Sequence, residues 1–480
     1  MPPKFALFIG AVFVLYAFRS DRKRRLVSPS GIFWPTLWYM TVSSRMLGVW
    51  LQTWGIPLPG GGDAGGGSLI DASFFLLLTI IGFRILAKRR FEWSAAFRAN
   101  PWLTALFVFM AASICWSSYP FVSFKRYVKI LGSVAMAFVV LSNDQPLESF
   151  LTLLRRCLYV HLPMSIICIK YFREIGVAFD WSGESHSWQG ISTSKNDLGQ
   201  VAMLGLLYFA WEVVRQWPRR KWKNLHVVYL LMAMYLLKGS EDAISMTSVS
   251  VGVFAVMVFL RLQMLRSRPA AARGFTRLVF AGTVSLVSLI LIHSVVMFSS
   301  DSLFGHLITT FGRNITLTDR TYIWHDVYAA ASRNPLMGVG FGGFWIGREA
   351  NIPWAAKMTW VLGQGHNGYI DTYLQVGLIG SALLAGVIFS TIPKLLRALD
   401  EDYDFACLRI TIFLTILFVN VTETTYLRGD HHLWFVMMLV VWIIPRPSAT
   451  NDDTSISVEP VPAEETADPA PAPEFVNTLS

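Results

Sequence analysis

Long, uninterrupted apolar segments recur along the chain and constrain its fold more than any other feature. A run of about 20 apolar residues spans a bilayer as an α-helix, and runs without apolar/polar alternation argue against a β-barrel. The chain is 54% hydrophobic and only 15% charged, which is far from the balance of soluble domains. We therefore expect an all-α integral membrane protein with about 12–13 transmembrane helices. The expected spans lie near residues 4–19, 31–53, 69–87, 101–117, 127–142, 150–171, 198–215, 225–239, 245–262, 276–298, 368–392, 405–421 and 431–445.

Basic residues gather in alternate connections between these segments. Cytoplasmic connections of membrane proteins collect Lys and Arg, so the basic side is expected to be cytoplasmic and the long segment Ser299–Gly365 periplasmic. The same bias accounts for the net charge of +10 without a nucleic-acid partner. The basic clusters are Arg22–Arg25, Lys88–Arg90, Arg155–Arg156, Arg215–Lys223, Arg261–Arg277 and Lys394 with Arg397.

The pattern divides the chain into four parts. Residues 1–298 are expected to form N-terminal transmembrane helices, 299–367 a large structured periplasmic loop, and 368–446 C-terminal transmembrane helices. Residues 447–480 are rich in Pro, Ala and acidic residues and are expected to form a disordered cytoplasmic tail. The four cysteines lie within or beside apolar runs and lack metal-ligand spacing.

Two motifs in the long loop invite a local interpretation. Residues 318–331 have the pattern of an amphipathic helix that Thr318 or Asp319 can cap and that Asn334-Pro335 stops. Gly338, Gly340 and Gly343 match G-x-G-x-x-G, but the βαβ context that a dinucleotide site needs is absent. The glycines therefore indicate either close approach to a ligand or a compact turn that lays aromatic residues on the membrane interface.

The stretch Gly363–Gly380 places a histidine and an asparagine at the head of an apolar run. If a helix begins near Asn367, His366 is its N-cap and shares a face with Tyr369 and Tyr373. A helix N-terminus is a natural seat for a phosphate. His366 is thus either a structural cap or a catalytic group at the membrane surface.

Further polar residues are expected on the same side of the membrane. Each of them alone could be a solvated or snorkelling charge. Together they form a set of cations and one histidine without an acidic pair, which favours an anionic diphosphate ligand over glycoside hydrolysis. Walker, HExxH and GxSxG motifs are missing from the sequence. The residues are Lys125, Arg126, Lys195, Asn196, Arg320, Glu423 and Arg428.

These motifs resemble those of the O-antigen ligase and O-antigen/exopolysaccharide polymerase superfamily, over about residues 30–445. The main ones are Asp319-Arg320-Thr-Tyr-Ile-Trp324, Asn334-Pro335 with Gly338-x-Gly340, and His366-Asn367-x-Tyr369 followed by Gly377-Leu-x-Gly380. The shorter ones are Ser44-Arg45, Trp116-Ser-x-x-Pro120-x-x-Ser123-x-Lys125-Arg126 and Lys195-Asn196-x-Leu198-Gly199.

The resemblance implies a multi-span glycosyltransferase in the bacterial inner membrane. Such proteins move a glycan from an undecaprenyl-diphosphate-linked oligosaccharide donor to an acceptor hydroxyl, without nucleotide sugar, cofactor or metal. His366 then matches the family's essential histidine and Arg320 its loop arginine, and both are expected to be catalytic. Arg320 is expected to hold the diphosphate, and His366 to position or deprotonate the acceptor hydroxyl. Substrate-binding roles fall to Lys195, Asn196, Arg126, Lys125, Asn367, Tyr369, Glu423 and Arg45.

Two departures from the family pattern favour a repeat-unit polymerase over a ligase acting on a lipid A-core acceptor. A family arginine is replaced by Met246, and a family glutamate in the helix after the histidine is Gln375. Besides donor, glycan acceptor and bilayer, chain-length or export proteins are possible partners. A lipid-linked sugar transporter is the alternative of another class. It would concentrate ionisable residues at mid-membrane depth, whereas here polar residues concentrate in one outside loop.

Overall fold

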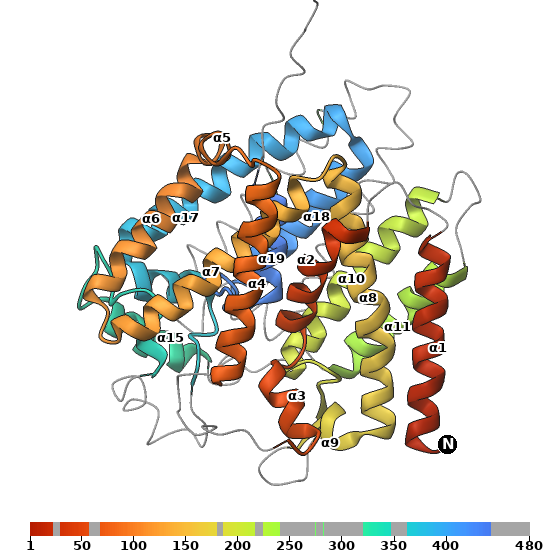
Figure 1. The fold of residues 1–480 in the computed structure, drawn as a ribbon. Helices are drawn as coiled ribbons and strands as arrows, with labels where there is room; N and C mark the ends of the chain where they lie inside the picture. Colours follow the sequence, from red (N-terminus) through yellow and green to blue (C-terminus); the bar gives the residue numbers. More distant parts are fainter. Residues whose placement is uncertain are drawn as a thin grey trace, which may run out of the picture. The chain divides into compact units, whose positions relative to one another are not determined.

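The computed structural model describes residues 1–22, 29–56, 68–179, 186–216, 224–240, 274, 282, 320–346 and 362–442 (Figure 1). These residues are almost all helical, which confirms the all-α membrane class. A two-stranded antiparallel sheet pairs β1 (Val177–Phe179) with β2 (His186–Trp188). The helices are α1 (Pro3–Arg22), α2 (Pro29–Ser43), α3 (Leu47–Thr53), α4 (Leu69–Lys88), α5 (Trp93–Ala99), α6 (Pro101–Ser113), η1 (Ile114–Trp116), α7 (Pro120–Leu141), α8 (Pro146–Tyr171), α9 (Arg173–Gly176), α10 (Lys195–Gln216), α11 (Asn224–Ser240), α15 (Arg320–Ala331), η3 (Phe344–Ile346), α17 (Gly368–Glu401), α18 (Tyr403–Val419) and α19 (His432–Val441).

Within the described residues, five helices are long and apolar enough to cross a membrane. The number of candidate spans rises to six if α5 and α6 are counted as one broken span, since the two helices meet at 104°. The expected spans 245–262 and 276–298, the capping residues Thr318 and Asp319, and the tail 447–480 lie outside the described residues. The loop helix expected over 318–331 is present as α15.

Two expected boundaries are wrong. The single span 31–53 divides into α2 and α3 because the chain between them is bonded to the loop before α10. There the Arg45 N–H donates to Ile191 O at 3.2 Å and Thr193 Oγ1 donates to Ser44 O at 3.3 Å. The span expected to begin at 127 begins instead at Pro120, where proline takes the first helical position.

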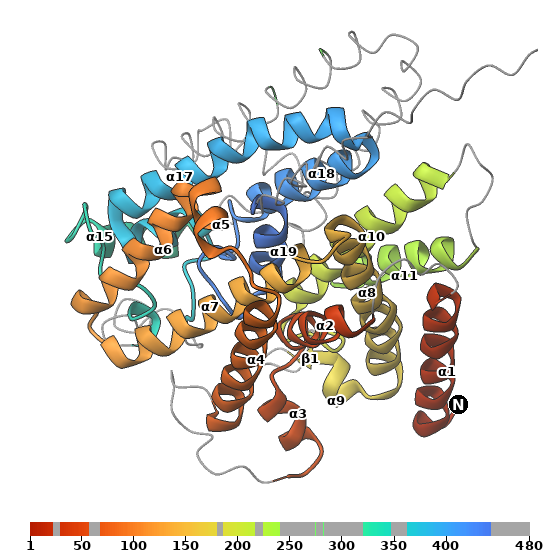
Figure 2. The ribbon, with the colours of Figure 1, turned by 45° about the horizontal axis from the view of Figure 1, so that its top comes forward.

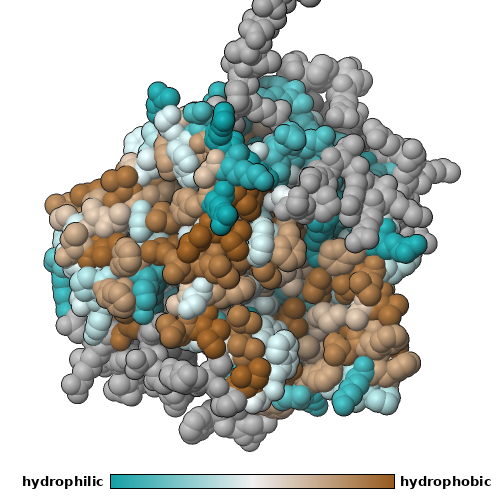
Figure 3. All heavy atoms as spheres, in the orientation of Figure 1, coloured by the Kyte–Doolittle hydropathy of each residue, from teal (hydrophilic) through white to brown (hydrophobic). Residues whose placement is uncertain are grey.

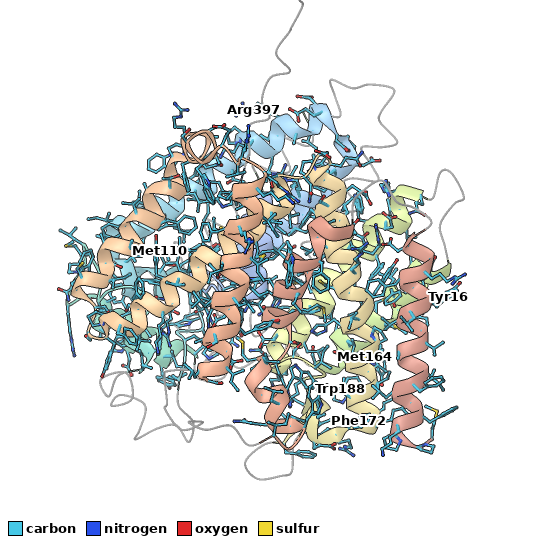
Figure 4. The ribbon with its side chains drawn as sticks, in the orientation of Figure 1. Tyr16, Met110, Met164, Phe172, Trp188 and Arg397 are labelled. Atoms are coloured by element: carbon cyan, nitrogen blue, oxygen red, sulfur yellow. The ribbon has the colours of Figure 1, made fainter. Side chains whose placement is uncertain are left out.

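The surface and the ends of the helices are arranged as a membrane protein requires. On the face in Figure 3, hydrophobic residues form a belt over α1, α4 and α6. These three helices carry exposed large apolar side chains, among them Phe8, Leu77 and Val108. Figure 4 places Arg397 at the opposite end of the helices from Phe172 and Trp188. Arg397 belongs to a basic connection, whereas Phe172 and Trp188 belong to the connection between α8 and α10. These two connections therefore lie at opposite ends of the helices, as the charge pattern predicts.

The long helix α17 lies beside α6 in Figures 1 and 2 and is broken at Gly377. Gly377 has φ 62° and ψ −164°, so the backbone groups around it lose their helical partners. The segment 335–340, which begins as a turn, supplies other partners for these groups, which matters because unpaired backbone groups are costly in a membrane. The replacing bonds are Val339 N–H to Leu374 O (2.9 Å), Gly340 N–H to Gln375 O (3.0 Å), Leu378 N–H to Pro335 O (2.8 Å) and Ile379 N–H to Leu336 O (3.1 Å).

The glycine motif of the loop thus serves close backbone packing. A Cβ at Gly338 would lie 2.6 Å from the Gln375 carbonyl, and one at Gly340 2.6 Å from Ser117 Cα. Both residues also have positive φ, 70° and 96°. The turn is compact, but it does not lay its aromatic residues on the membrane interface, because Phe341 and Trp345 are buried in the protein, 2% and 8% exposed.

We predict that Gly377→Ala prevents correct folding. The new Cβ would meet Leu336 O at 2.3 Å, and the positive φ adds strain of about 1–3 kcal/mol. The measurement is the yield of monodisperse detergent-solubilised protein and its melting temperature. Gly363→Ala is the control, because its Cβ would meet nothing within 4 Å. Equal melting temperatures for both variants would contradict the prediction.

Candidate functional site

His366 lies just before α17 in a left-handed backbone conformation, with φ 49°. The sequence-based assignment of His366 as the N-cap is wrong. Asn367 is the cap, and its Oδ1 accepts the N–H groups of Tyr369 and Ile370 at 3.0 Å each. Because His366 stands outside the helix, helical spacing does not place it on a face with Tyr369 and Tyr373. Its conformation is costly for a non-glycine residue and is held by its neighbours.

The loop helix α15 is one of those neighbours. Trp324 Nε1 donates to His366 O at 3.2 Å. Trp324 is also part of a buried apolar cluster that joins α15 to the first turns of α17. The cluster therefore fixes the backbone of His366 by burial of large side chains. Its buried members are Ile323, Trp324, Val327, Ala331, Trp345, Leu362, Ile370 and Leu374.

Glu423 is the centre of the polar contacts around His366. It lies between α18 and α19 and is only 3% exposed. Arg320 Nη2 donates to its Oε1 at 2.7 Å, and Asn196 Nδ2 donates to the same oxygen at 2.6 Å. His366 Nδ1 lies 3.3 Å from Glu423 Oε2. Four residues that the sequence analysis named separately are thus brought into one cluster.

The electrostatic balance keeps Glu423 ionised. Burial by itself raises the pKa of this carboxyl, but Arg320 and His366 outweigh burial and lower the pKa below its ordinary value of 4.5. An ionised Glu423 can hold the His366 proton on Nδ1. In that tautomer the lone pair is on Nε2, which makes the imidazole a proton acceptor.

A cavity of about 100 Å³ adjoins this cluster. Three cations line it, Arg126, Lys129 and Arg428, and Gln364 forms part of the wall toward His366. Arg126 Nη1 donates to the Gly342 carbonyl at 2.7 Å, and among the described residues no carboxylate forms an ion pair with it. The cavity therefore suits an anion. The full lining is Arg126, Lys129, Phe341, Gly342, Trp345, Gly363, Gln364, Asp371, Gln375, Leu427, Arg428, Gly429 and Asp430.

Two carboxylates besides Glu423 also occur in this region, and neither of them was predicted from the sequence. Asp371 and Asp430 line the cavity, and each is held by donors. Asp371 accepts Trp345 Nε1 at 2.8 Å, and Asp430 lies 3.5 Å from Lys129 Nζ. Burial raises the pKa of Asp430, but Lys129, Arg428 and Arg126 together outweigh burial and lower it below its ordinary value. Both carboxylates thus have structural partners.

Several residues expected to bind substrate have other surroundings. Lys125 lies on α7 over the Phe121 ring, 5.2 Å from its centroid, and Lys195 is exposed on the first turn of α10. Arg45 donates to the carbonyl of Ile175 on α9 and to that of Ser192 in the loop before α10. The Tyr369 hydroxyl donates to Leu417 O at 3.0 Å. None of the four is among the described residues that line the cavity.

The sequence analysis missed Lys129, Gln364, Asp371 and Asp430. Helical spacing could have found two of them, because Lys129 follows Arg126 by three residues and Asp371 follows Asn367 by four. Gln364 and Asp430 lie in irregular segments, where spacing carries no such information.

One group within the described residues has the composition of a metal site. Single ligand atoms of Asp197, His431 and His432 lie within 4.8 Å of one another. However, His431 Nδ1 accepts the Leu433 N–H at 3.2 Å and caps α19, so its neutral ring carries the proton on Nε2, 3.7 Å from Asp197. A ligating Nε2 would need a lone pair there. We therefore interpret the group as a helix-capping contact.

Comparison with known proteins identifies related sequences. Residues 227–385 match the family model described as O-antigen ligase. The chain is also 28% identical over 313 residues to the exopolysaccharide production protein ExoQ of Rhizobium meliloti (strain 1021), covering 63% of this chain and 67% of that protein. The matched family segment includes Arg320, His366 and the break in α17. Both findings support the O-antigen ligase and polymerase superfamily, so the resemblance noted in the sequence is confirmed.

The lowered pKa of Glu423 predicts how stability depends on pH. A carboxylate whose folded-state pKa is depressed stabilises the protein above its unfolded pKa, near 4.5, and this contribution is lost as pH falls through the folded value. Glu423→Gln should therefore melt at a lower temperature than wild type at pH 7, and the difference should shrink below pH 4.5. Thermal unfolding in detergent between pH 7 and 3.5 measures this. The exposed Glu92 supplies the control Glu92→Gln, and an unchanged gap at low pH would argue against the assignment.

Proposed function

We propose that this multi-pass membrane protein of the O-antigen ligase and polymerase type transfers a glycan from an undecaprenyl-diphosphate-linked donor to a sugar hydroxyl. The observation that carries the proposal is the juxtaposition of a cation-lined cavity with a histidine backed by a carboxylate. The cavity supplies a place for the diphosphate, and His366 supplies a base for the acceptor. We place the protein in the bacterial inner membrane, with this site on the periplasmic side.

The reaction follows from these positions. The acceptor hydroxyl oxygen attacks the anomeric carbon of the donor glycan as its proton passes to His366 Nε2. The bond between that carbon and the diphosphate oxygen breaks, and the diphosphate leaves with the electron pair. A single displacement of this kind inverts the anomeric centre. Glu423 stabilises the imidazolium that forms, as a carboxylate behind a general base does.

The cations divide into two groups. Arg320 bonds to Glu423 and to the Thr422 carbonyl, so we assign it to holding the carboxylate in place. This replaces the diphosphate role that the sequence suggested for it. Arg126, Lys129 and Arg428 face the cavity and would stabilise the charge that develops on the departing diphosphate.

The polymerase is the favoured form of the reaction. The relative found by comparison is named an exopolysaccharide production protein, and Met246 and Gln375 depart from the ligase pattern. Gln375 now has a visible role, since its Oε1 accepts the Gly342 N–H at 3.0 Å at the cavity wall. The expected product is a polymer of repeat units still attached to the lipid carrier.

His366→Ala should abolish polymer formation while the protein still inserts in the membrane. Loss of a general base lowers rates by about 10²–10⁴-fold. The assay is formation of new glycosidic bonds by purified protein from lipid-linked oligosaccharide. His325→Ala is the control, because His325 lies exposed on α15 near the site. Full-length polysaccharide from His366→Ala would refute the assignment.

Arg126→Ala should raise the KM for the lipid-linked donor by roughly 10- to 100-fold, the range for a lost hydrogen bond to a charged group. Because the cavity retains two cations, kcat should change less. Arg333→Ala, an exposed arginine just after α15, is expected to leave both constants unchanged. If the Arg126→Ala enzyme has a wild-type KM, the cavity is not the place where the diphosphate binds.

A further inference from the structure

Gln364 connects the cavity to the histidine. Its side chain lines the cavity, and its Oε1 accepts Arg428 Nη1 at 2.8 Å. Its Nε2 lies 3.4 Å from Glu423 Oε2 and 3.4 Å from His366 Nδ1. Arginine can only donate and an ionised carboxylate can only accept. The orientation of the amide is therefore fixed by its partners, with oxygen toward Arg428 and nitrogen toward Glu423.

The two contacts at His366 Nδ1 exclude each other. Donation from Nδ1 to Glu423 needs the proton on Nδ1, whereas acceptance from Gln364 Nε2 needs the lone pair there. The first arrangement leaves Nε2 as a base, and the second puts the proton on Nε2. At 3.3 and 3.4 Å neither contact is much shorter than the other. Gln364 thus competes with Glu423 for the tautomer of the imidazole.

The contacts of Gln364 differ in length. Its bond to Arg428 is short, 2.8 Å, while both contacts of its Nε2 are 3.4 Å long. The other contacts of Arg428 are long as well, 3.8 Å to Asp430 and 3.4 Å to Thr424 O. An anion in the cavity would attract Arg428. Gln364 would move with Arg428, because the bond from Arg428 Nη1 to Gln364 Oε1 is the shortest of its contacts. The longer contacts to His366 and Glu423 open first.

We propose that Gln364 is a positioning residue that couples occupancy of the cavity by a diphosphate to the tautomer of His366. The proposal rests on the proposed function of the site. Without diphosphate, Gln364 keeps part of the His366 population with the proton on Nε2. With diphosphate bound, Gln364 follows Arg428, Nδ1–H is held by Glu423, and Nε2 becomes the base. The enzyme then acquires its base only when a donor is present.

The test measures the tautomer directly by solid-state NMR of 15N-histidine-labelled protein in nanodiscs. The His366 signals are identified as those lost in His366→Ala. Adding undecaprenyl diphosphate to wild type should increase the fraction with the proton on Nδ1 at least two-fold. Gln364→Ala should show that tautomer with and without the ligand. Gln52→Ala, an exposed glutamine on α3, should respond as wild type does.

Arg428→Ala gives a second arm, because it removes the link while leaving Gln364 in place. Its tautomer ratio should no longer change when undecaprenyl diphosphate is added, although Gln364 is present. The inference is overturned if the His366 tautomer ratio of wild type does not change when undecaprenyl diphosphate is added. It is also overturned if the ratio of Gln364→Ala does change. These outcomes are separate from the transfer assay. An active His366→Ala enzyme defeats the proposed function. An inactive His366→Ala enzyme, together with a wild-type tautomer ratio that does not respond to undecaprenyl diphosphate, defeats only the coupling.

Discussion

The buried charge of Glu423 is the interaction on which the site depends. A carboxylate removed from water must be paired, since an unpaired buried charge costs several kcal/mol. Its partners come from the first turn of α10, the start of α15 and the segment before α17. The ionised Glu423 therefore brings together parts of the chain that are more than 200 residues apart in the sequence, as Asn196 and Glu423 are. The charge that orients His366 also holds α15 against the helices, through Arg320.

A second constraint acts on the backbone. The break at Gly377 would expose carbonyl and N–H groups in an apolar setting, and the segment 335–340 satisfies them. The same segment continues to Gly342, whose carbonyl accepts Arg126 and whose N–H donates to Gln375. Filling the break in α17 thus also builds one wall of the cavity. The glycines of the loop are explained by close packing of backbone on backbone, without a ligand.

Much of the site could be predicted from the sequence. His366, Arg320, Asn196 and Glu423 were all identified from their places in the expected loops, and the structure joins them. The N-cap was assigned to His366 because it opens the apolar run, yet the shorter Asn367 side chain reaches the N–H groups of the first turn. Arg320 was expected to face the ligand. In the structure its charge is neutralised by Glu423, which lies 103 residues further along the chain, so the sequence around Arg320 could not indicate this partner. Gln364 carries no local signal at all.

The sequence by itself determined that the chain is helical and membrane-embedded, and which connections are basic. Those properties follow from the composition of each segment, because transfer into a bilayer is close to a sum over neighbouring residues. Tertiary structure decided which cations are neutralised and which line the cavity. Lys125 and Arg126 are adjacent, yet one lies over Phe121 and the other reaches Gly342. Adjacent residues on a helix point about 100° apart, so only the packing of distant elements can assign them different roles.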